Sequence, residues 1–116
     1  MKIKIASESI TVDELKEISK EFYYPMIKGA VDIEEEVAAF GGEYHVDASE
    51  KLLERGSKPE NIWGFNIYLD KEKKSPDWIE YVALINIRPS QNNRSMEIQR
   101  EETRQKIKNI LYKLIH

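Results

Sequence analysis

Alternation of apolar and polar side chains is the feature that most constrains how this chain can fold. Trp63, Phe65 and Ile67 recur at every second position between residues 62 and 69. Between residues 79 and 88 the recurring side chains are Ile79, Tyr81, Ala83, Ile85 and Ile87. Because successive side chains of a strand point to opposite faces, this period predicts two neighbouring strands with one shared buried face. Their reverse face mixes polar and apolar residues, so we expect part of it to lie beneath a helix.

Shorter segments predict three more strands. Residues 2–6 alternate, and residues 26–33 and 36–40 form a predicted hairpin joined by the pair Glu34 and Glu35. In that register one face carries Ile27, Gly29, Val31 and Ile33 together with Ala38 and Phe40. The link lacks the Gly or Asn that tight hairpin turns prefer, so a slip of one residue remains an alternative.

Three helices are predicted from capping signals and from helical spacing of apolar residues. Thr11 and Glu14 form a capping-box pattern, and Pro25 marks the end of that first helix. A second helix starts with the capping signature of residues 47–50 and closes at Gly56. The third spans residues 100–115. Its expected inward-facing side chains are Ile107, Ile110, Leu111 and Leu114.

The resulting order, β-α-β-β-α-β-β-α, predicts the α+β class. We expect a mostly antiparallel sheet of four to five strands with helices packed on one face. The first six elements match a ferredoxin-like order. No repeat, low-complexity tract or Gly/Ser linker divides the 116 residues, so the prediction is a single α+β domain over residues 1–116.

Composition excludes several classes of protein. The chain has no cysteine, which rules out disulfides, thiolate zinc sites and a cysteine nucleophile. No run approaches the roughly 18 apolar residues of a membrane span, and the N-terminal residues lack the hydrophobic stretch of a signal peptide. The sequence therefore predicts a cytoplasmic protein without a membrane partner.

Positive charge is concentrated near the C-terminus. Residues 1–85 hold 11 basic and 18 acidic side chains, whereas residues 86–116 hold 7 basic and 3 acidic ones. Such asymmetry is typical of an anion-binding surface, but the solvated face of a terminal helix produces the same counts. Both interpretations stay open at this point.

The first candidate site is the Arg/Asn-rich turn, residues 86–95. Planar guanidinium groups match carboxylate and phosphate oxygens, so the turn predicts an anionic ligand: a phosphate-bearing small molecule or a nucleic-acid backbone. The alternative is ordinary turn chemistry, with the arginines paired to Glu80 or Glu97. The candidate ligand-binding residues are Asn86, Arg88, Asn92, Asn93, Arg94 and Ser95, and the basic residues that extend the positive field are Arg100, Arg104, Lys106 and Lys108.

The second candidate site is the set Glu43, His45 and Asp47. If this segment is extended, the three side chains project to one side and suit a divalent metal of a metal-assisted hydrolase, with Asp70 or Glu80 as further ligands. The alternative makes Asp47 a helix cap, His45 a partly buried hydrogen-bonding ring and Glu43 a surface residue. The leading hypothesis needs no cofactor, and whether the protein is an enzyme stays undecided.

Aromatic residues support a third hypothesis. Trp63, Trp78, Tyr81 and residues 22–24 are abundant for a short chain. At strand spacing, aromatic side chains build a core or a subunit contact more often than a stacking site. A protein-interaction domain without catalysis, including a homo-oligomer, is therefore the other alternative.

Three ordered blocks resemble a known family. They are Gly-Gly-Glu-x-His-x-Asp at residues 41–47, Trp-Gly-x-Asn-x-Tyr at residues 63–68, and Asn-Ile-Arg-Pro followed by Asn-Arg-Ser at residues 86–95. Over residues 26–115 the chain is similar to a family of short uncharacterised prokaryotic proteins, a domain of unknown function. Members carry Gly where this chain has Asn92 and Pro where it has Leu69, and both differences affect turn geometry. The resemblance implies a shared fold and a shared site but names no reaction.

Overall fold

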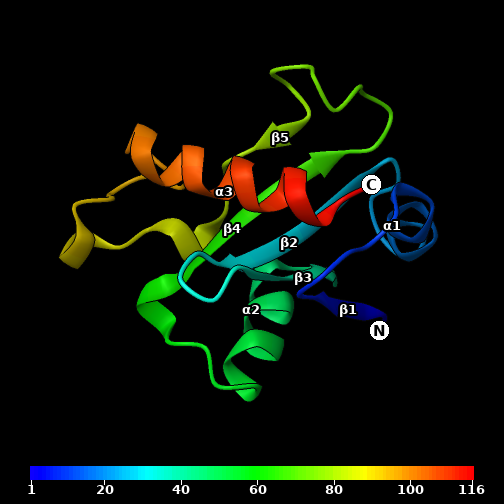
Figure 1. Cartoon of the computed structure of the whole chain (residues 1–116). Helices are drawn as coiled ribbons and strands as arrows, with labels where there is room; N and C mark the ends of the chain where they lie inside the picture. Colours follow the sequence, from blue (N-terminus) through cyan, green and yellow to red (C-terminus); the bar gives the residue numbers. More distant parts are fainter.

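Five antiparallel strands form one sheet in the computed structural model, which describes residues 1–116 (Figure 1). The strands lie in the order β1-β3-β2-β4-β5. Their bounds are Ile3–Ala6 for β1, Met26–Asp32 for β2, Val37–Gly41 for β3, Ile62–Tyr68 for β4 and Ile79–Glu80 for β5. The helices are α1 at Val12–Ser19, α2 at His45–Glu54 and α3 at Glu101–Leu114. The predicted α+β class and the order of the elements are confirmed.

The β2–β3 hairpin has the expected register. Gly29 pairs with Phe40, and Val31 pairs with Ala38. The turn needs no Gly or Asn, because Oδ1 of Asp32 accepts the backbone amides of Glu34 and Glu35, each at 3.0 Å, and Glu36 takes the left-handed conformation with φ of 56°. A buried carboxylate thus replaces the usual turn residues and holds the register.

The capping box of α1 is also confirmed. The backbone amide of Glu14 donates to Oγ1 of Thr11 at 3.0 Å, and the amide of Thr11 donates back to Oε1 of Glu14 at 3.2 Å. The helix ends at Ser19, and residues 20–25 form turns before β2 begins. This local signal acts within four residues, which is why the sequence alone predicts it.

Helices lie on both faces of the sheet, and the expectation that they pack on one face is wrong (Figure 1). The α3 face holds the larger core, in which Phe40 and Phe65 meet the buried side chains Ile107 and Leu111. On the opposite face α2 packs against the central strands through a smaller core, whose members are Ala30, Val37, Ala39, Ala48, Leu52 and Ile62. The centre of the sheet is apolar on both sides, and the small side chains of one side allow α2 to lie close.

The sheet order also differs from a ferredoxin-like one. β1, β3 and β2 are adjacent as in a split βαβ unit, but β4 pairs with β2 along its whole length, Met26 to Asp32, instead of lying beside β1. The first six elements therefore follow the expected sequence order with a different spatial order.

The predicted strand over residues 79–88 is wrong beyond its first two residues. Only Ile79 and Glu80 pair with β4, and residues 84–86 form a turn of 3-10 helix. The side chain of Asn86 takes the place of a strand partner, because it accepts from the amide of Gly64 at 2.8 Å and donates to the carbonyl of Gly64 at 3.0 Å. A single amide side chain thus pairs both backbone groups of Gly64 on the part of β4 that β5 does not reach.

None of the helices combines the length and the apolar character that crossing a membrane requires.

Candidate functional site

Two buried asparagines of the Arg/Asn-rich turn, Asn86 and Asn93, form hydrogen bonds to backbone groups of neighbouring segments. Nδ2 of Asn93 donates to the carbonyl oxygens of Asn86 at 2.8 Å and Ser95 at 2.9 Å, and its Oδ1 accepts from the amide of Gln99 at 2.9 Å. Asn93 is 3% exposed and Asn86 is fully buried. Both side chains are committed to backbone groups, so they shape the turn and leave no donor for a ligand.

Arg88 is also bound to backbone oxygens. Its guanidinium donates to the carbonyl groups of Ile85 at 3.2 Å, Glu60 at 3.2 Å and Ile62. It stacks on the indole of Trp63 with 4.3 Å between the guanidinium carbon and the ring centroid. Burial lowers the pKa of Arg88 from its ordinary value, and the Glu60 carboxylate opposes this. Arg88 therefore fastens the turn to the start of β4.

The other polar residues of the turn lie at the surface or serve local structure. Arg94 is exposed and forms no ion pair with Glu97, which pairs with Arg104 instead at 2.5 Å. Asn92 has a φ of 60° and ends the 3-10 helix Pro89–Gln91. Oγ of Ser95 accepts the amide of Glu97 at 3.1 Å. The structure does not bring Arg88 and Arg94 to one common hollow.

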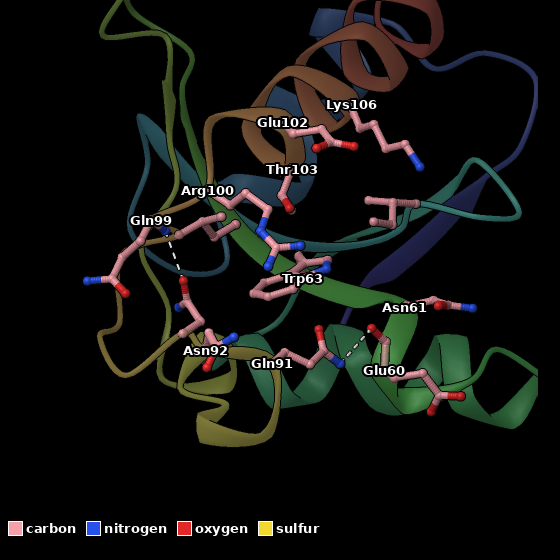
Figure 2. A pocket seen from close by; sticks show the side chains of 13 residues that line it. Glu60, Asn61, Trp63, Gln91, Asn92, Gln99, Arg100, Glu102, Thr103 and Lys106 are labelled. Carbon is pink, nitrogen blue, oxygen red and sulfur yellow. Dashed lines mark hydrogen bonds between the residues drawn. The ribbon is translucent and has the colours of Figure 1, made fainter.

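A cavity of about 580 Å³ lies beside the turn, and we call it the α3 cavity (Figure 2). The start of α3, the end of the turn and the start of β4 enclose it, with the Trp63 indole among its walls. Two candidate residues, Asn92 and Asn93, and two residues of the expected positive field, Arg100 and Lys106, line it. The other lining residues are Ile33, Glu60, Asn61, Trp63, Gln91, Ile98, Gln99, Glu102 and Thr103.

Arg100 is the basic side chain of the α3 cavity that forms no ion pair; the Glu60 and Glu102 carboxylates in the lining are also without an ion pair. Arg100 and Trp63 both line this cavity (Figure 2). The neighbouring basic side chains are paired, Arg104 with Glu97 and Lys106 with Glu34 at 4.0 Å, whereas no carboxylate pairs with Arg100. Nε1 of Trp63 is buried and has no hydrogen-bond partner. The cavity thus contains a cation without an ion pair, and its wall includes a tryptophan whose buried indole nitrogen is unpaired.

The segment with Glu43, His45 and Asp47 is not extended, because His45 is the first residue of α2. Oδ2 of Asp47 accepts the amides of Glu43 at 3.1 Å and Tyr44 at 2.9 Å, so Asp47 caps the helix from inside its first turn. No group of three or more His, Asp or Glu residues lies close enough to hold a metal ion. His45 is a partly buried hydrogen-bonding ring, as in the alternative, but the N-cap is Tyr44 and Asp47 lies in the first turn, so α2 begins two residues before the expected start at residue 47.

Replacing Asp47 with alanine is expected to lower the free energy of unfolding by about 1 kcal/mol, because two amides at the start of α2 lose their acceptor. Urea denaturation measures the change. Glu50→Ala is the control, since Glu50 is an exposed residue of the same helix. Equal stability of Asp47→Ala and Glu50→Ala would contradict the capping role.

His45 belongs to a network with residues of β4 and β5. Its Nε2 lies 2.7 Å from Oδ1 of Asn66 and 3.1 Å from the carbonyl oxygen of Phe65. Nδ2 of Asn66 donates to Oε1 of Glu80 at 2.8 Å, and the same oxygen accepts the Tyr68 hydroxyl at 2.9 Å. The polar reverse side of β4, expected from the alternation, is therefore a connected chain of hydrogen bonds.

Comparison with known proteins decides the family. Residues 4–114 match the family model described as "Protein of unknown function (DUF5674)". The chain belongs to this family. The expected membership of a family of unknown function is confirmed, while the three sequence blocks remain an interpretation of the sequence. The comparisons with curated proteins and with solved structures found no match.

In this DUF5674 protein the two candidate sites remain separate. The α3 cavity is lined by residues of the C-terminal segment, whereas His45 lines another cavity with Asn66. Sequence reasoning placed Trp63 in the core and missed its place in the cavity wall. The alternation of apolar residues in β4 predicts only which face of the sheet Trp63 occupies. It therefore assigned Trp63 to the interior and gave no indication that the ring also lines a cavity.

Proposed function

We propose that the protein binds a small anionic, phosphate-bearing ligand in the α3 cavity, with Arg100 as the principal cation. The observation that carries the proposal is the guanidinium of Arg100, which lines the cavity from the N-cap position of α3 and forms no ion pair. A volume of about 580 Å³ suits a small molecule rather than a folded partner. The anionic ligand expected from the sequence is retained, and its main contacts shift from Arg88 and Arg94 to Arg100.

The start of α3 adds favourable electrostatics. No side chain caps this helix of 14 residues; the amide of Thr103 donates to the Arg100 carbonyl at 3.1 Å, and the amides of Glu101 and Glu102 have no partner within the helix. The positive end of the helix dipole and these free amides attract an anion. Thr103 in the first turn of the helix lines the cavity, and Asn92 lies across from it in the turn. A phosphate group there has several donors within the wall of one cavity.

Two carboxylates also line the cavity, and neither neutralises Arg100. Figure 2 shows the Glu60 side chain directed away from the Arg100 guanidinium. Glu102 precedes Lys106 by one helical turn, so Lys106, which also pairs with Glu34, offsets part of the negative charge of Glu102. The net attraction for an anion therefore comes from Arg100 and the helix end.

The test uses the fluorescence of Trp63. A Trp78→Phe background leaves Trp63 as the only tryptophan, and pyrophosphate is titrated at about 20 mM and about 200 mM salt. We expect a saturable signal that weakens as salt rises. Arg100→Gln is expected to raise the Kd about tenfold or more, because a hydrogen-bonded charge pair is lost. Arg94→Gln is the control, since Arg94 belongs to the same segment but does not line the cavity.

The outcomes separate the alternatives. No saturable response to pyrophosphate, or equal weakening by Arg100→Gln and Arg94→Gln, would overturn the assignment to the α3 cavity. A single-stranded RNA that binds much more tightly than pyrophosphate, with a salt dependence that reports several phosphates, would favour a nucleic-acid backbone over a small molecule.

A further inference from the structure

A second cavity lies on the opposite face of the sheet, and we call it the His45 cavity. Its volume is about 400 Å³, and eight of its eleven lining residues are hydrophobic. It is formed by the start of α2, the strands β2 and β4, and the irregular segment that follows β5. The lining residues are Met26, Lys28, Tyr44, His45, Val46, Asn66, Val82, Ala83, Leu84, Ile85 and Met96. An apolar cavity with a few polar groups is the usual form of a small-molecule site.

The hydrogen-bond network determines which nitrogen of His45 carries the proton. Nδ2 of Asn66 faces two acceptors, Oε1 of Glu80 and the carbonyl oxygen of Val82, so its Oδ1 must face His45. Nε2 of His45 then lies between two acceptors, Oδ1 of Asn66 and the Phe65 carbonyl, and must be the protonated nitrogen. In the neutral ring this leaves Nδ1 as a free hydrogen-bond acceptor.

Three groups around His45 affect its charge. Burial lowers the pKa of His45 from its ordinary value, the hydrogen bond to Asn66 raises it, and the positive charge of Lys28 lowers it further. Glu80, behind Asn66, has a smaller raising effect. Lys28 has no carboxylate partner and lies 4.5 Å from the centroid of the Tyr23 ring. At neutral pH the imidazole is therefore uncharged, and Nδ1 keeps its lone pair.

Exposed apolar side chains surround the entrance of the His45 cavity. Leu84 is 71% exposed and Tyr44 is 58% exposed, and Val46 and Met96 are also exposed. Apolar side chains that gather around a concave site are typical of ligand binding, because a bound apolar molecule removes them from water.

We propose that the His45 cavity binds a small, mainly apolar molecule whose polar end is a hydroxyl group that donates a hydrogen bond to Nδ1 of His45. Tyr44, Leu84 and Met96 contact the apolar body of the ligand, and the chain from Tyr68 through Glu80 and Asn66 holds the imidazole in the accepting form. This site is independent of the α3 cavity, because the two share no lining residue.

The test compares phenol with anisole, which has a similar shape but no hydroxyl donor. Binding is followed at neutral pH by the ¹⁵N resonance of Nδ1 of His45. We expect phenol to shift this resonance saturably as the lone pair accepts a hydrogen bond. Anisole is expected to bind about tenfold more weakly, because it cannot donate the hydrogen bond that phenol gives to Nδ1. We expect phenol to leave the affinity for pyrophosphate unchanged, because the two molecules bind in different cavities.

Two exposed leucines provide a matched pair of variants that leave the fold intact. Leu84→Ser removes apolar contact within the cavity and is expected to weaken phenol binding several-fold, whereas Leu53→Ser, outside the cavity, leaves it unchanged. The proposal is overturned if phenol produces no saturable shift, if anisole binds as well as phenol, or if the two serine variants behave alike.

Discussion

Replacing Asn86 with alanine is expected to lower the free energy of unfolding by about 3–5 kcal/mol. Asn86 is fully buried and binds three backbone groups: the amide of Gly64 at 2.8 Å, the carbonyl of Gly64 at 3.0 Å and the carbonyl of Met96 at 3.2 Å. Alanine leaves these groups without a partner, and each buried unsatisfied group costs about 1–3 kcal/mol. The estimate is the sum over the three groups, reduced because some relaxation lets water reach the segment.

Guanidinium denaturation at neutral pH measures this loss. Asn109→Ala is the matched control, since Asn109 is exposed on α3 and bonds only to the side chain of Gln105. Its effect is expected to stay within about 0.5 kcal/mol. A cost below about 1 kcal/mol for Asn86→Ala would show that this side chain does not substitute for a strand beside β4.

Replacing Phe65 with alanine is expected to cost a similar amount, about 3–5 kcal/mol, for an apolar reason. Phe65 is fully buried in the larger core and packs against Phe40 with 5.7 Å between the ring centroids at an angle of 71°. Its ring also lies over Gly29, where an added Cβ would be 2.4 Å from Cζ of Phe65. Alanine removes the ring from this tightly filled space and leaves a cavity.

Phe65→Leu separates lost volume from lost aromatic character. Leucine keeps much of the apolar volume, so we expect a cost below about 1.5 kcal/mol in the same denaturation experiment. Comparable costs for Phe65→Leu and Phe65→Ala would contradict the account, because the loss would then depend on the aromatic contact with Phe40 rather than on the filled space.

The two cavities differ in the chemistry they offer. The α3 cavity has a guanidinium without an ion pair and the N-terminus of a helix. The His45 cavity is apolar with one accepting imidazole. They lie on opposite faces of the sheet because α3 covers one face and α2 the other. Substitutions at Arg100 and Leu84 therefore test two separate properties of the protein.

Local patterns predicted most of the secondary structure. The alternation from Trp63 to Ile67, the hairpin register of Val31 with Ala38, and the capping box of Thr11 with Glu14 are all present in the structure. Each depends on neighbouring residues or on one short turn, so the information lies within a short window of sequence. The predicted strand is wrong after Glu80 because its place beside β4 is taken by the side chain of Asn86. Asn86 is 22 residues from Gly64 in the sequence, so no short window contains this contact.

The α+β class, three helices, four of the strands and the positive charge of the C-terminal segment could all be predicted from local sequence patterns. Contacts between distant segments place helices on both faces of the sheet and bring His45 to Asn66. They also bind Arg88 and Asn93 to backbone groups, whereas Arg100 forms no ion pair. The physical reason is the range of the interactions. Periodicity and capping depend on residues that are near neighbours in the sequence. Whether a guanidinium or amide side chain supports the fold or is available to a ligand depends on which distant carbonyl or carboxylate lies within about 3 Å of it.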